Sequence, residues 1–150
     1  MTDHRLYEGQ LAKNSISFTL KALPDNYAAA QDRVRDFLSP LGCKMRTLME
    51  LDMIVEEIFI NIASYAYGEG HGDASVDLSL NDSSDTLTMT FRDSGIPYNP
   101  LRKESPDITS AAMDRAVGGL GIFLVQKYAD GMSYEYKGGE NCLTILKKLR

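Results

Sequence analysis

The chain has 150 residues, of which 43% are hydrophobic and 25% are charged, which is typical of one soluble domain that buries its own core. The formal net charge is −5 and no basic tract is visible, so nucleic acid is not an expected partner. Cys43 and Cys142 are too few for a disulfide scaffold or a zinc site and are expected to be reduced thiols.

The first residues lack the apolar stretch of a secretory signal. No segment approaches the about 20 apolar residues that span a bilayer. We therefore expect a cytoplasmic protein with no membrane partner. Residues 1–13 are interpreted as an N-terminal extension and residues 14–150 as one domain.

The first predicted elements are a strand and a helix. Ile16, Phe18 and Leu20 alternate as in a strand. Pro24 to Asn26 open a helix, which Pro40 to Gly42 close. Its apolar face is expected to contain Tyr27, Ala30, Val34, Phe37, Leu38 and Leu41.

A second helix is predicted from about Lys44 to Gly68. One apolar stripe repeats at three- and four-residue intervals and should face the core: Leu48, Leu51, Val55, Ile58, Ile62 and Tyr65. At about 100° per residue, Glu57 and Asn61 lie at the border of this stripe, whereas Glu56 points away from it. Glu57 and Asn61 could therefore line a ligand site. The alternative is that they simply hydrogen-bond each other on the helix surface.

A hairpin follows the glycine-rich turn of residues 68–73. Val76, Leu78 and Leu80 form one face of its first strand, and Asn81 to Asp85 form its turn. In the second strand, Leu87, Met89 and Phe91 face inward, and the same alternation carries Asp93 onto the inward face.

A buried carboxylate at position 93 needs a hydrogen-bond donor. The exocyclic amino group of a purine would supply one, and Gly95 lacks the side chain that would keep a flat ring from the backbone. The alternative is a turn at the strand end, in which Asp93 accepts hydrogen bonds from nearby backbone N–H groups.

Residues 98–117 contain two prolines and little apolar periodicity, which predicts a long loop. Because it separates two candidate ligand-binding motifs, we expect it to be a lid that closes over a nucleotide, although an ordinary surface loop is the alternative.

A helix is predicted from Ile122 to Tyr128, and directly before it lie Gly118, Gly119, Leu120 and Gly121. Bare N–H groups at the start of a helix favour phosphate oxygens. The spacing matches neither a Walker A loop nor the dinucleotide fingerprint.

The chain ends in a second hairpin. Met132, Tyr134 and Tyr136 alternate, residues 138–141 form the turn, and Leu143, Ile145 and Leu149 return. Because tight turns join neighbouring strands, the sheet should be largely antiparallel. The predicted fold class is α+β, a two-layer sandwich with a mostly antiparallel mixed sheet covered on one face by three helices.

In this order, three segments resemble the N, G1 and G2 boxes of the GHKL ATPase superfamily. Glu57-x-x-x-Asn61 with Tyr65 and Tyr67 is similar to the N box, and Asp93-x-Gly95-x-Pro97-Tyr98-Asn99-Pro100 to G1. Gly118 to Gly121, with Asp130, are similar to G2. The resemblance runs from about Asn14 to the C-terminus and is closest to the stand-alone anti-sigma-factor serine/threonine-protein kinases of bacterial partner-switching systems.

The resemblance implies a histidine-kinase-like ATPase fold that binds ATP and Mg²⁺, with Glu57 as the general base. Asn61 would coordinate magnesium, and Asp93 would recognise adenine, with Gly95 and Pro97 beside the nucleotide. The turn of Gly118, Gly119, Leu120 and Gly121 would hold phosphate. Related kinases often have an arginine directly before these glycines, where this chain has Val117, so Arg115 is the candidate to reach the terminal phosphate.

The function implied is that of an anti-sigma factor and serine/threonine-protein kinase that phosphorylates an anti-anti-sigma antagonist of the STAS type. A sigma factor would be the other partner, and a homodimer is possible. Because Val117 replaces arginine, a non-catalytic ATP-responsive binding module is the alternative function. The catalytic domain of a sensor histidine kinase is a third possibility, although the ATPase-like region nearly fills the chain and leaves no room for phosphoacceptor helices.

Overall fold

The computed structural model describes residues 14–102 and 117–150, with the backbone alone at residues 102 and 117–121. Within these ranges, five strands form one sheet: β1 (Ser15–Lys21), β2 (Asp73–Leu80), β3 (Thr86–Asp93), β4 (Gly131–Lys137) and β5 (Glu140–Lys148). The strand order is β1-β2-β3-β5-β4, and every neighbouring pair is antiparallel.

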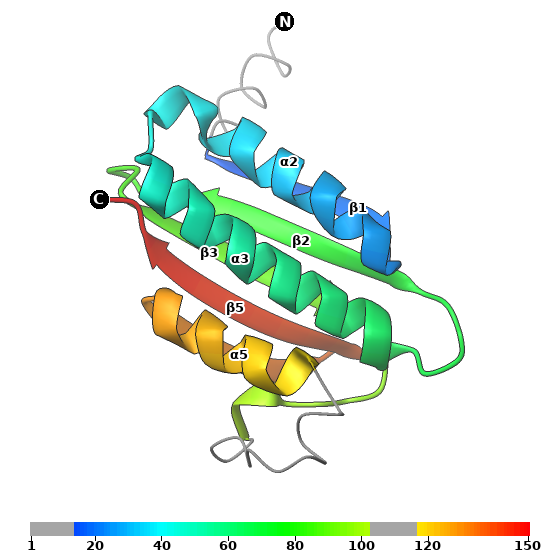
Figure 1. Ribbon diagram of the computed structural model, residues 1–150. Coiled ribbons are helices and arrows are strands. Elements are labelled where there is room, and N and C mark those ends of the chain that lie inside the picture. The colour runs from blue at the N-terminus through cyan, green and yellow to red at the C-terminus, as the bar shows by residue number, and fades with distance from the viewer. Residues whose placement is uncertain (1–13, 103–116) are drawn as a thin grey trace, which may run out of the picture.

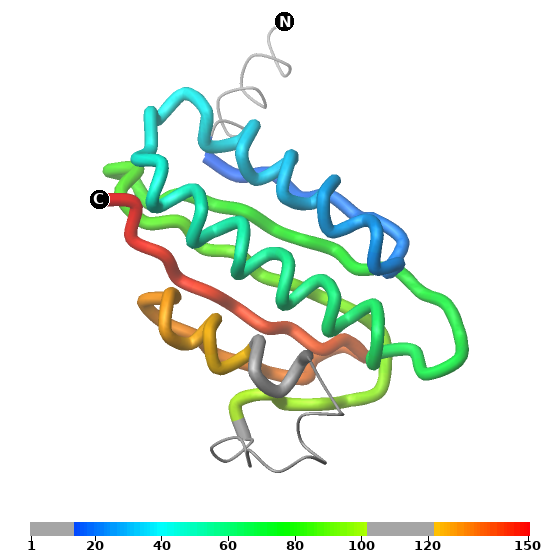
Figure 2. Tube along the Cα trace, viewed as in Figure 1, coloured from blue at the N-terminus to red at the C-terminus, as the bar shows by residue number. Residues whose placement is uncertain are grey.

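Three α-helices of the described chain lie on one face of this sheet (Figure 1). They are α2 (Tyr27–Leu38), α3 (Met45–Asn61) and α5 (Val117–Tyr128). The tube in Figure 2 shows α3 as the middle helix, between α2 and α5. The predicted two-layer α+β sandwich is confirmed, and its described strands are all antiparallel.

The core lies between the helices and the sheet. Every second residue of β3 is buried, as the alternation predicts: Leu87, Met89, Phe91 and Asp93. The helices contribute their predicted apolar positions, among them Ala30, Val34, Leu38, Leu51, Val55 and Ile58. No described helix has both the length and the apolar content that crossing a membrane requires.

The predicted first helix is three residues too long at its C-terminal end. α2 ends at Leu38, and a short 3-10 helix, η2 (Ser39–Leu41), follows it. Pro40 has no N–H group with which to continue an α-helix, and Gly42 has a φ of 62°, which reverses the chain. Leu41 is consequently exposed rather than part of the apolar face.

The predicted second helix changes type near its end. α3 stops at Asn61 and continues as a π-helical turn, η3 (Ile62–Ala66). A π-turn bonds residue i to i+5, so side chains after Ile62 leave the 3.6-residue register. Tyr65, expected in the core stripe, is therefore 54% exposed.

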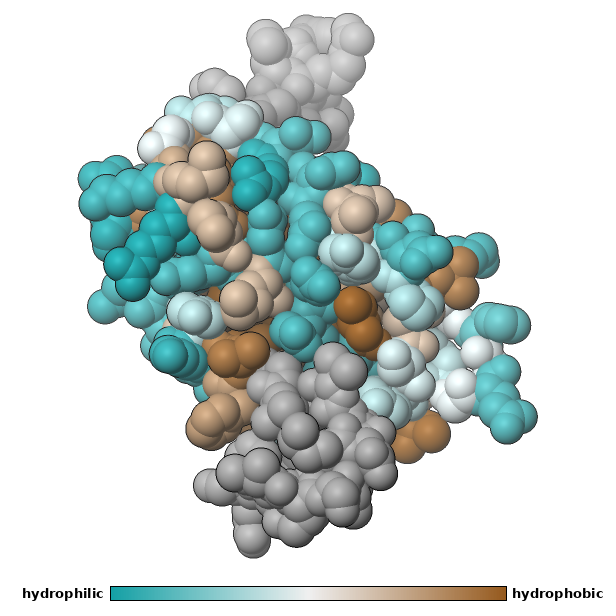
Figure 3. All heavy atoms as spheres, viewed as in Figure 1, coloured by the Kyte–Doolittle hydropathy of each residue, from teal (hydrophilic) through white to brown (hydrophobic). Residues whose placement is uncertain are grey.

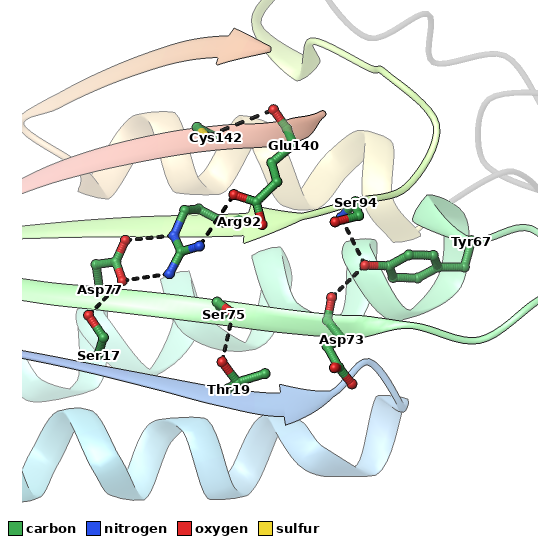
Figure 4. A network of polar contacts seen from close by, with 10 residues as sticks. All are labelled: Ser17, Thr19, Tyr67, Asp73, Ser75, Asp77, Arg92, Ser94, Glu140 and Cys142. Atoms are coloured by element: carbon green, nitrogen blue, oxygen red, sulfur yellow. Dashed lines mark hydrogen bonds and ion pairs between the residues drawn. The ribbon is translucent and has the colours of Figure 1, made fainter. Parts of the chain in front are cut away.

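Polar side chains occupy the sheet face opposite the helices. Arg92 of β3 donates through Nε and Nη2 to the Asp77 carboxylate of β2, over 2.8 and 3.0 Å, and through Nη1 to Glu140 of β5 over 3.3 Å (Figure 4). The Ser17 hydroxyl of β1 donates to Asp77 over 2.7 Å. These bonds join four strands and fix the face of β3 that carries Arg92, so the next residue, Asp93, points to the helices.

The outward face of the helices is partly apolar. Figure 3 shows tan and brown side chains gathered over α3 and α5. The exposed residues there include Met45 and Met49 of α3 and Phe123 and Leu124 of α5. Met45 and Met49 lie outside the stripe that the periodicity assigned to the core.

Candidate nucleotide-binding site

The residues of the three sequence motifs come from α3, from the end of β3 and from the start of α5. α3 packs against α5, and all three segments lie toward the same end of the molecule (Figure 1). The motif residues thus lie on neighbouring elements, although they are distant along the chain.

Glu57 and Asn61 are one turn apart on α3, and both are partly buried. Burial raises the pKa of the Glu57 carboxyl, and the nearby charge of Glu56 raises it further. No hydrogen bond joins Glu57 to Asn61, so the alternative in which the two side chains satisfy each other is not what the structure shows. A carboxylate whose pKa is raised in this way is suited to accept a proton.

Asp93 is only 6% exposed at the end of β3. Its Oδ1 atom accepts two hydrogen bonds, from the backbone N–H of Gly95 and from Nδ2 of Asn141, both over 2.9 Å. The turn interpretation is therefore correct for Oδ1. No described residue donates a hydrogen bond to Oδ2, which leaves a buried carboxylate oxygen able to take a donor from a ligand.

The segment after Asp93 is fastened to the end of η3. Ile96 donates its N–H to the carbonyl oxygen of Ala66 over 2.8 Å. A Cβ atom on Gly95 would stand 2.1 Å from that same oxygen. Gly95 is therefore required by contact with protein backbone, a reason that the sequence analysis did not give.

Tyr67 forms a second connection at this point. Its hydroxyl donates to the carbonyl oxygen of Asp73 over 2.5 Å and accepts the N–H of Ser94 over 2.9 Å (Figure 4). Burial raises the pKa of the Tyr67 hydroxyl, so this group stays protonated and keeps its donor at neutral pH. The tail of the Glu57–Asn61 helix therefore holds β2 and the segment after Asp93 together.

Asn141 is a candidate site residue that the sequence motifs do not identify. The sequence predicts a turn at this position, but β5 begins at Glu140 and Asn141 lies directly opposite Asp93 in the sheet. Its inward alternation with Leu143 and Ile145 was the signal that could have identified it. Asn141 also bonds to Tyr98 and Tyr134, so it connects β4, β5 and the segment after β3.

The glycine motif lies inside a helix rather than before it. α5 begins at Val117, so Gly118, Gly119, Leu120 and Gly121 are in its first turns. The first four N–H groups of an α-helix lack intrahelical partners, and in α5 these include Gly118, Gly119 and Leu120 but not Gly121, the fifth residue. These three residues are thus compatible with donation to phosphate. Pro97 is exposed in the segment after Asp93. Arg115 and most of the predicted lid lie outside the described residues.

The donor set around Asn61 is compatible with magnesium. Among residues 14–102 and 117–150, no group of three or more His, Cys, Asp or Glu side chains is arranged to hold a metal ion. A carboxamide oxygen is a hard ligand, and magnesium commonly takes one or two protein oxygens together with phosphate oxygens and waters. Asn61 fits that mode of binding, in which the nucleotide completes the coordination.

Comparison with known protein families identifies a match over most of the chain. Residues 20–147 match the model of the histidine kinase-like ATPase domain. The chain belongs to this family. Membership implies ATP binding, and the matched range contains all three motifs of this histidine kinase-like ATPase domain.

The curated relatives of this histidine kinase-like ATPase domain include bacterial protein kinases and anti-sigma F factors. The serine/threonine-protein kinase BtrW of Bordetella bronchiseptica is 29% identical over 100 residues, 67% of this chain and 70% of the relative. An anti-sigma F factor of Oceanobacillus iheyensis is 23% identical over 80% of this chain and 82% of the relative. The serine-protein kinase RsbW of Listeria monocytogenes is 24% identical, covering 84% and 82%.

Solved structures confirm the fold of this histidine kinase-like ATPase domain. The RsbU and RsbW domains of a Mycobacterium tuberculosis protein superpose with a TM-score of 0.63 at 13% identity, covering 90% of this chain and 32% of that one. One chain of the SiaB-SiaC complex from Pseudomonas aeruginosa gives a TM-score of 0.58 at 15% identity, and the match covers 98% of this chain and 98% of that one.

Proposed function

We propose that the chain is an anti-sigma factor and an ATP-dependent serine/threonine-protein kinase whose substrate is an anti-anti-sigma antagonist protein of the STAS type. The names of its relatives support this proposal, since BtrW is called a serine/threonine-protein kinase, RsbW a serine-protein kinase, and two others anti-sigma F factors. The match to the SiaB-SiaC complex supports a protein partner.

The observation that carries the proposal is the hydrogen bond between Ile96 and Ala66. It fastens the strand end that holds Asp93 to the tail of the helix that holds Glu57 and Asn61. This hydrogen bond connects the proposed adenine-recognising residue, Asp93, to the helix that carries the proposed general base and magnesium ligand. Such fixed positioning is the main contribution of a protein to phosphoryl transfer.

Asp93 is proposed to recognise the adenine base. The exocyclic amino group would donate to Oδ2, the buried oxygen that receives no hydrogen bond from the described residues. A carboxylate that accepts from a neutral donor makes a stronger hydrogen bond than a neutral acceptor does. Gly95 and Pro97 lie two and four residues after Asp93 and would contact the same nucleotide.

Asn61 is proposed to supply its carboxamide oxygen to magnesium, which when bound neutralises charge on the phosphates. The N–H groups of Gly118, Gly119 and Leu120 in the first turn of α5 would donate to phosphate oxygens, and Gly121 follows them in the next turn. Arg115 is the proposed cation for the terminal phosphate, in the place of the arginine that Val117 replaces.

Glu57 is proposed to accept the proton of a Ser or Thr hydroxyl on the antagonist. The hydroxyl oxygen forms its bond to the γ-phosphorus, the bond from that phosphorus to the bridging oxygen breaks, and ADP leaves with the bond's electron pair. The raised pKa of Glu57 brings its carboxylate closer to the basicity that this proton transfer needs.

Partner exchange would follow from the same reaction. The unphosphorylated antagonist and a sigma factor compete for the chain, and phosphorylation releases the antagonist so that the sigma factor is held again. Binding of ATP therefore biases which partner is bound.

Phosphate transfer provides the direct test. Incubation with γ-labelled ATP, Mg²⁺ and a candidate antagonist should label a Ser or Thr of the antagonist, and Glu57→Ala should abolish labelling while it spares ATP binding. Glu56→Ala is the matched control and should retain labelling. Nucleotide-dependent association without any transfer in the wild type would contradict the kinase proposal, and labelling that survives Glu57→Ala would reject the general base.

Calorimetric titration separates the two binding roles. Asn61→Ala should remove the effect of magnesium on ATP affinity, whereas Asp93→Ala should weaken binding of the nucleotide with or without magnesium. If the two variants lose affinity in the same way, the assignment of separate metal and base sites is wrong.

A further inference from the structure

Asn141 has every hydrogen-bonding position of its side chain occupied. Nδ2 donates to Oδ1 of Asp93 over 2.9 Å and to the carbonyl oxygen of Ile96 over 3.0 Å. Oδ1 accepts the N–H of Tyr98 over 3.0 Å and the hydroxyl of Tyr134. A carboxamide has two donor hydrogens and two acceptor lone pairs, so this network fixes the orientation of the amide: a flipped group would set donors against donors.

This arrangement is buried and costly to disturb. Asn141 is 7% exposed, and Asp93 beside it is 6% exposed. Loss of one partner would leave a polar atom of the other without a hydrogen bond in a place with little water. The side chain therefore holds Asp93 in one rotamer and holds the backbone of Ile96 and Tyr98 around it.

The consequence for Asp93 is that its two oxygens have different tasks. Oδ1 is fully used by Gly95 and Asn141, whereas Oδ2 receives no hydrogen bond from the described residues. A carboxylate that could rotate would offer either oxygen to solvent or to a ligand. With Asn141 in place, one oxygen is held inside the protein and the other is presented in a single direction.

We propose that Asn141 is a positioning residue that sets base specificity, by fixing Asp93 so that Oδ2 selects purines with an amino group at position 6. This inference rests on the proposed function, because it assumes that the base lies against Asp93. Asn141 itself acts through Asp93 and not on the nucleotide. A guanine base presents an oxygen at that position, which would oppose Oδ2 with a second acceptor.

The test compares two nucleotides that differ only in the amino group: ATP and purine riboside 5′-triphosphate. In the wild type, calorimetry with Mg²⁺ should give an affinity for ATP roughly 10- to 100-fold above that for the deaminated nucleotide, the value of one hydrogen bond to a charged group. In Asn141→Leu this ratio should fall toward one, because ATP binds more weakly while the deaminated nucleotide binds nearly as before.

Two further variants separate positioning from general damage. Asn141→Asp keeps the shape of the side chain and an acceptor for Tyr98, but it loses the donor to Asp93, so its ratio should also fall. Tyr134→Phe removes a hydrogen bond from the other end of Asn141 and is the matched control, in which the ratio should stay at the wild-type value.

If both Asn141 variants fail to fold, the proposal can be tested on the wild type by the ¹⁵N NMR signals of the Asn141 side-chain amide. ATP should shift these signals, and the deaminated nucleotide should leave them in place; equal shifts with both would overturn the proposal. Equal weakening of both nucleotides in a folded variant would also overturn it. A wild type that binds neither nucleotide would reject the proposed function, whereas a ratio that survives in the variants rejects Asn141 alone.

Discussion

The carbonyl oxygen of Ala66 accepts the N–H of Ile96 over 2.8 Å, and it is the same atom that a side chain at position 95 would strike. This contact joins the first sequence motif to the second through backbone atoms. The distance between the motifs is thus set by protein geometry before any ligand binds. A change at Gly95 should therefore affect folding and ligand binding together.

Gly95→Ala should destabilise the domain by about 1–3 kcal/mol, because its Cβ would stand 2.1 Å from the Ala66 oxygen and 2.5 Å from the Ala66 carbonyl carbon. Backbone atoms cannot rotate away as a side-chain tip can. Urea denaturation would measure the loss. Gly70→Ala is the control, since its Cβ would approach the Tyr67 oxygen only to 3.2 Å and should cost much less. Equal losses in both variants would contradict the argument.

The elements could be predicted from the sequence because their signals are local. Alternation placed Asp93 inward on β3, and the spacing of Leu51, Val55 and Ile58 gave the buried face of α3. These patterns depend only on the periods of strands and helices. The antiparallel pairing of β2 with β3 and of β4 with β5 followed in the same way from the short turns that join them.

The site was harder to predict where it depends on contacts between distant segments. Asn141 and Asp93 are 48 positions apart, and only the register of β3 with β5 brings them together. The π-turn after Asn61, which leaves Tyr65 exposed, also has no signal in the apolar pattern. The glycine motif predicts a helix that begins after Gly121, whereas α5 begins at Val117, about one turn earlier.

Tyr67→Phe should loosen the segment after Asp93 while leaving the core intact. The change removes the acceptor for the Ser94 N–H and the donor to the Asp73 carbonyl, and should cost about 0.5–1.5 kcal/mol. Amide hydrogen exchange at Ser94 should become faster. Tyr27→Phe is the control, because Tyr27 packs against the core and its hydroxyl has no hydrogen bond to a described residue. Unchanged exchange at Ser94 would show that the Tyr67 hydroxyl does not hold this segment.

The pH dependence of phosphate transfer should report the environment of Glu57. Its pKa is raised, so the carboxylate needed as a base is lost on acidification at a pH above about 4.3, the ordinary value for glutamate. Glu56→Gln removes the charge of Glu56, one of the two causes of the raised pKa. The pH at which the rate of phosphate transfer falls on acidification should therefore decrease, while burial keeps the pKa of Glu57 above its ordinary value. A ¹³C NMR titration of the Glu57 carboxyl gives the same comparison without activity. If activity falls at the same pH in wild type and Glu56→Gln, the charge of Glu56 does not raise the pKa of Glu57.

A buried lysine connects α3 and α5 to the sheet, away from the candidate site. Lys147 of β5 is 6% exposed, and its Nζ atom donates to Glu50 of α3 over 2.5 Å and to the carbonyl oxygen of Tyr128 at the end of α5 over 2.7 Å. One ammonium group thereby joins the sheet to both helices that carry the candidate site. The hydrogen bond from Lys147 lowers the pKa of Glu50, to which the Arg46 guanidinium also contributes.

Lys147→Met should destabilise the domain by about 1–3 kcal/mol at pH 7, because Glu50 and the Tyr128 carbonyl both lose a buried donor. Arg46→Ala breaks an exposed ion pair to the same Glu50 and should cost only about 0.3–0.5 kcal/mol. Since the pKa of Glu50 is lower in the folded than in the unfolded protein, its contribution is complete above about pH 4.3 and is lost as the pH falls through the folded value. Urea denaturation should therefore show the stability difference between wild type and Glu50→Gln shrinking on acidification, and a difference that stays constant down to pH 3 would rule out this linkage.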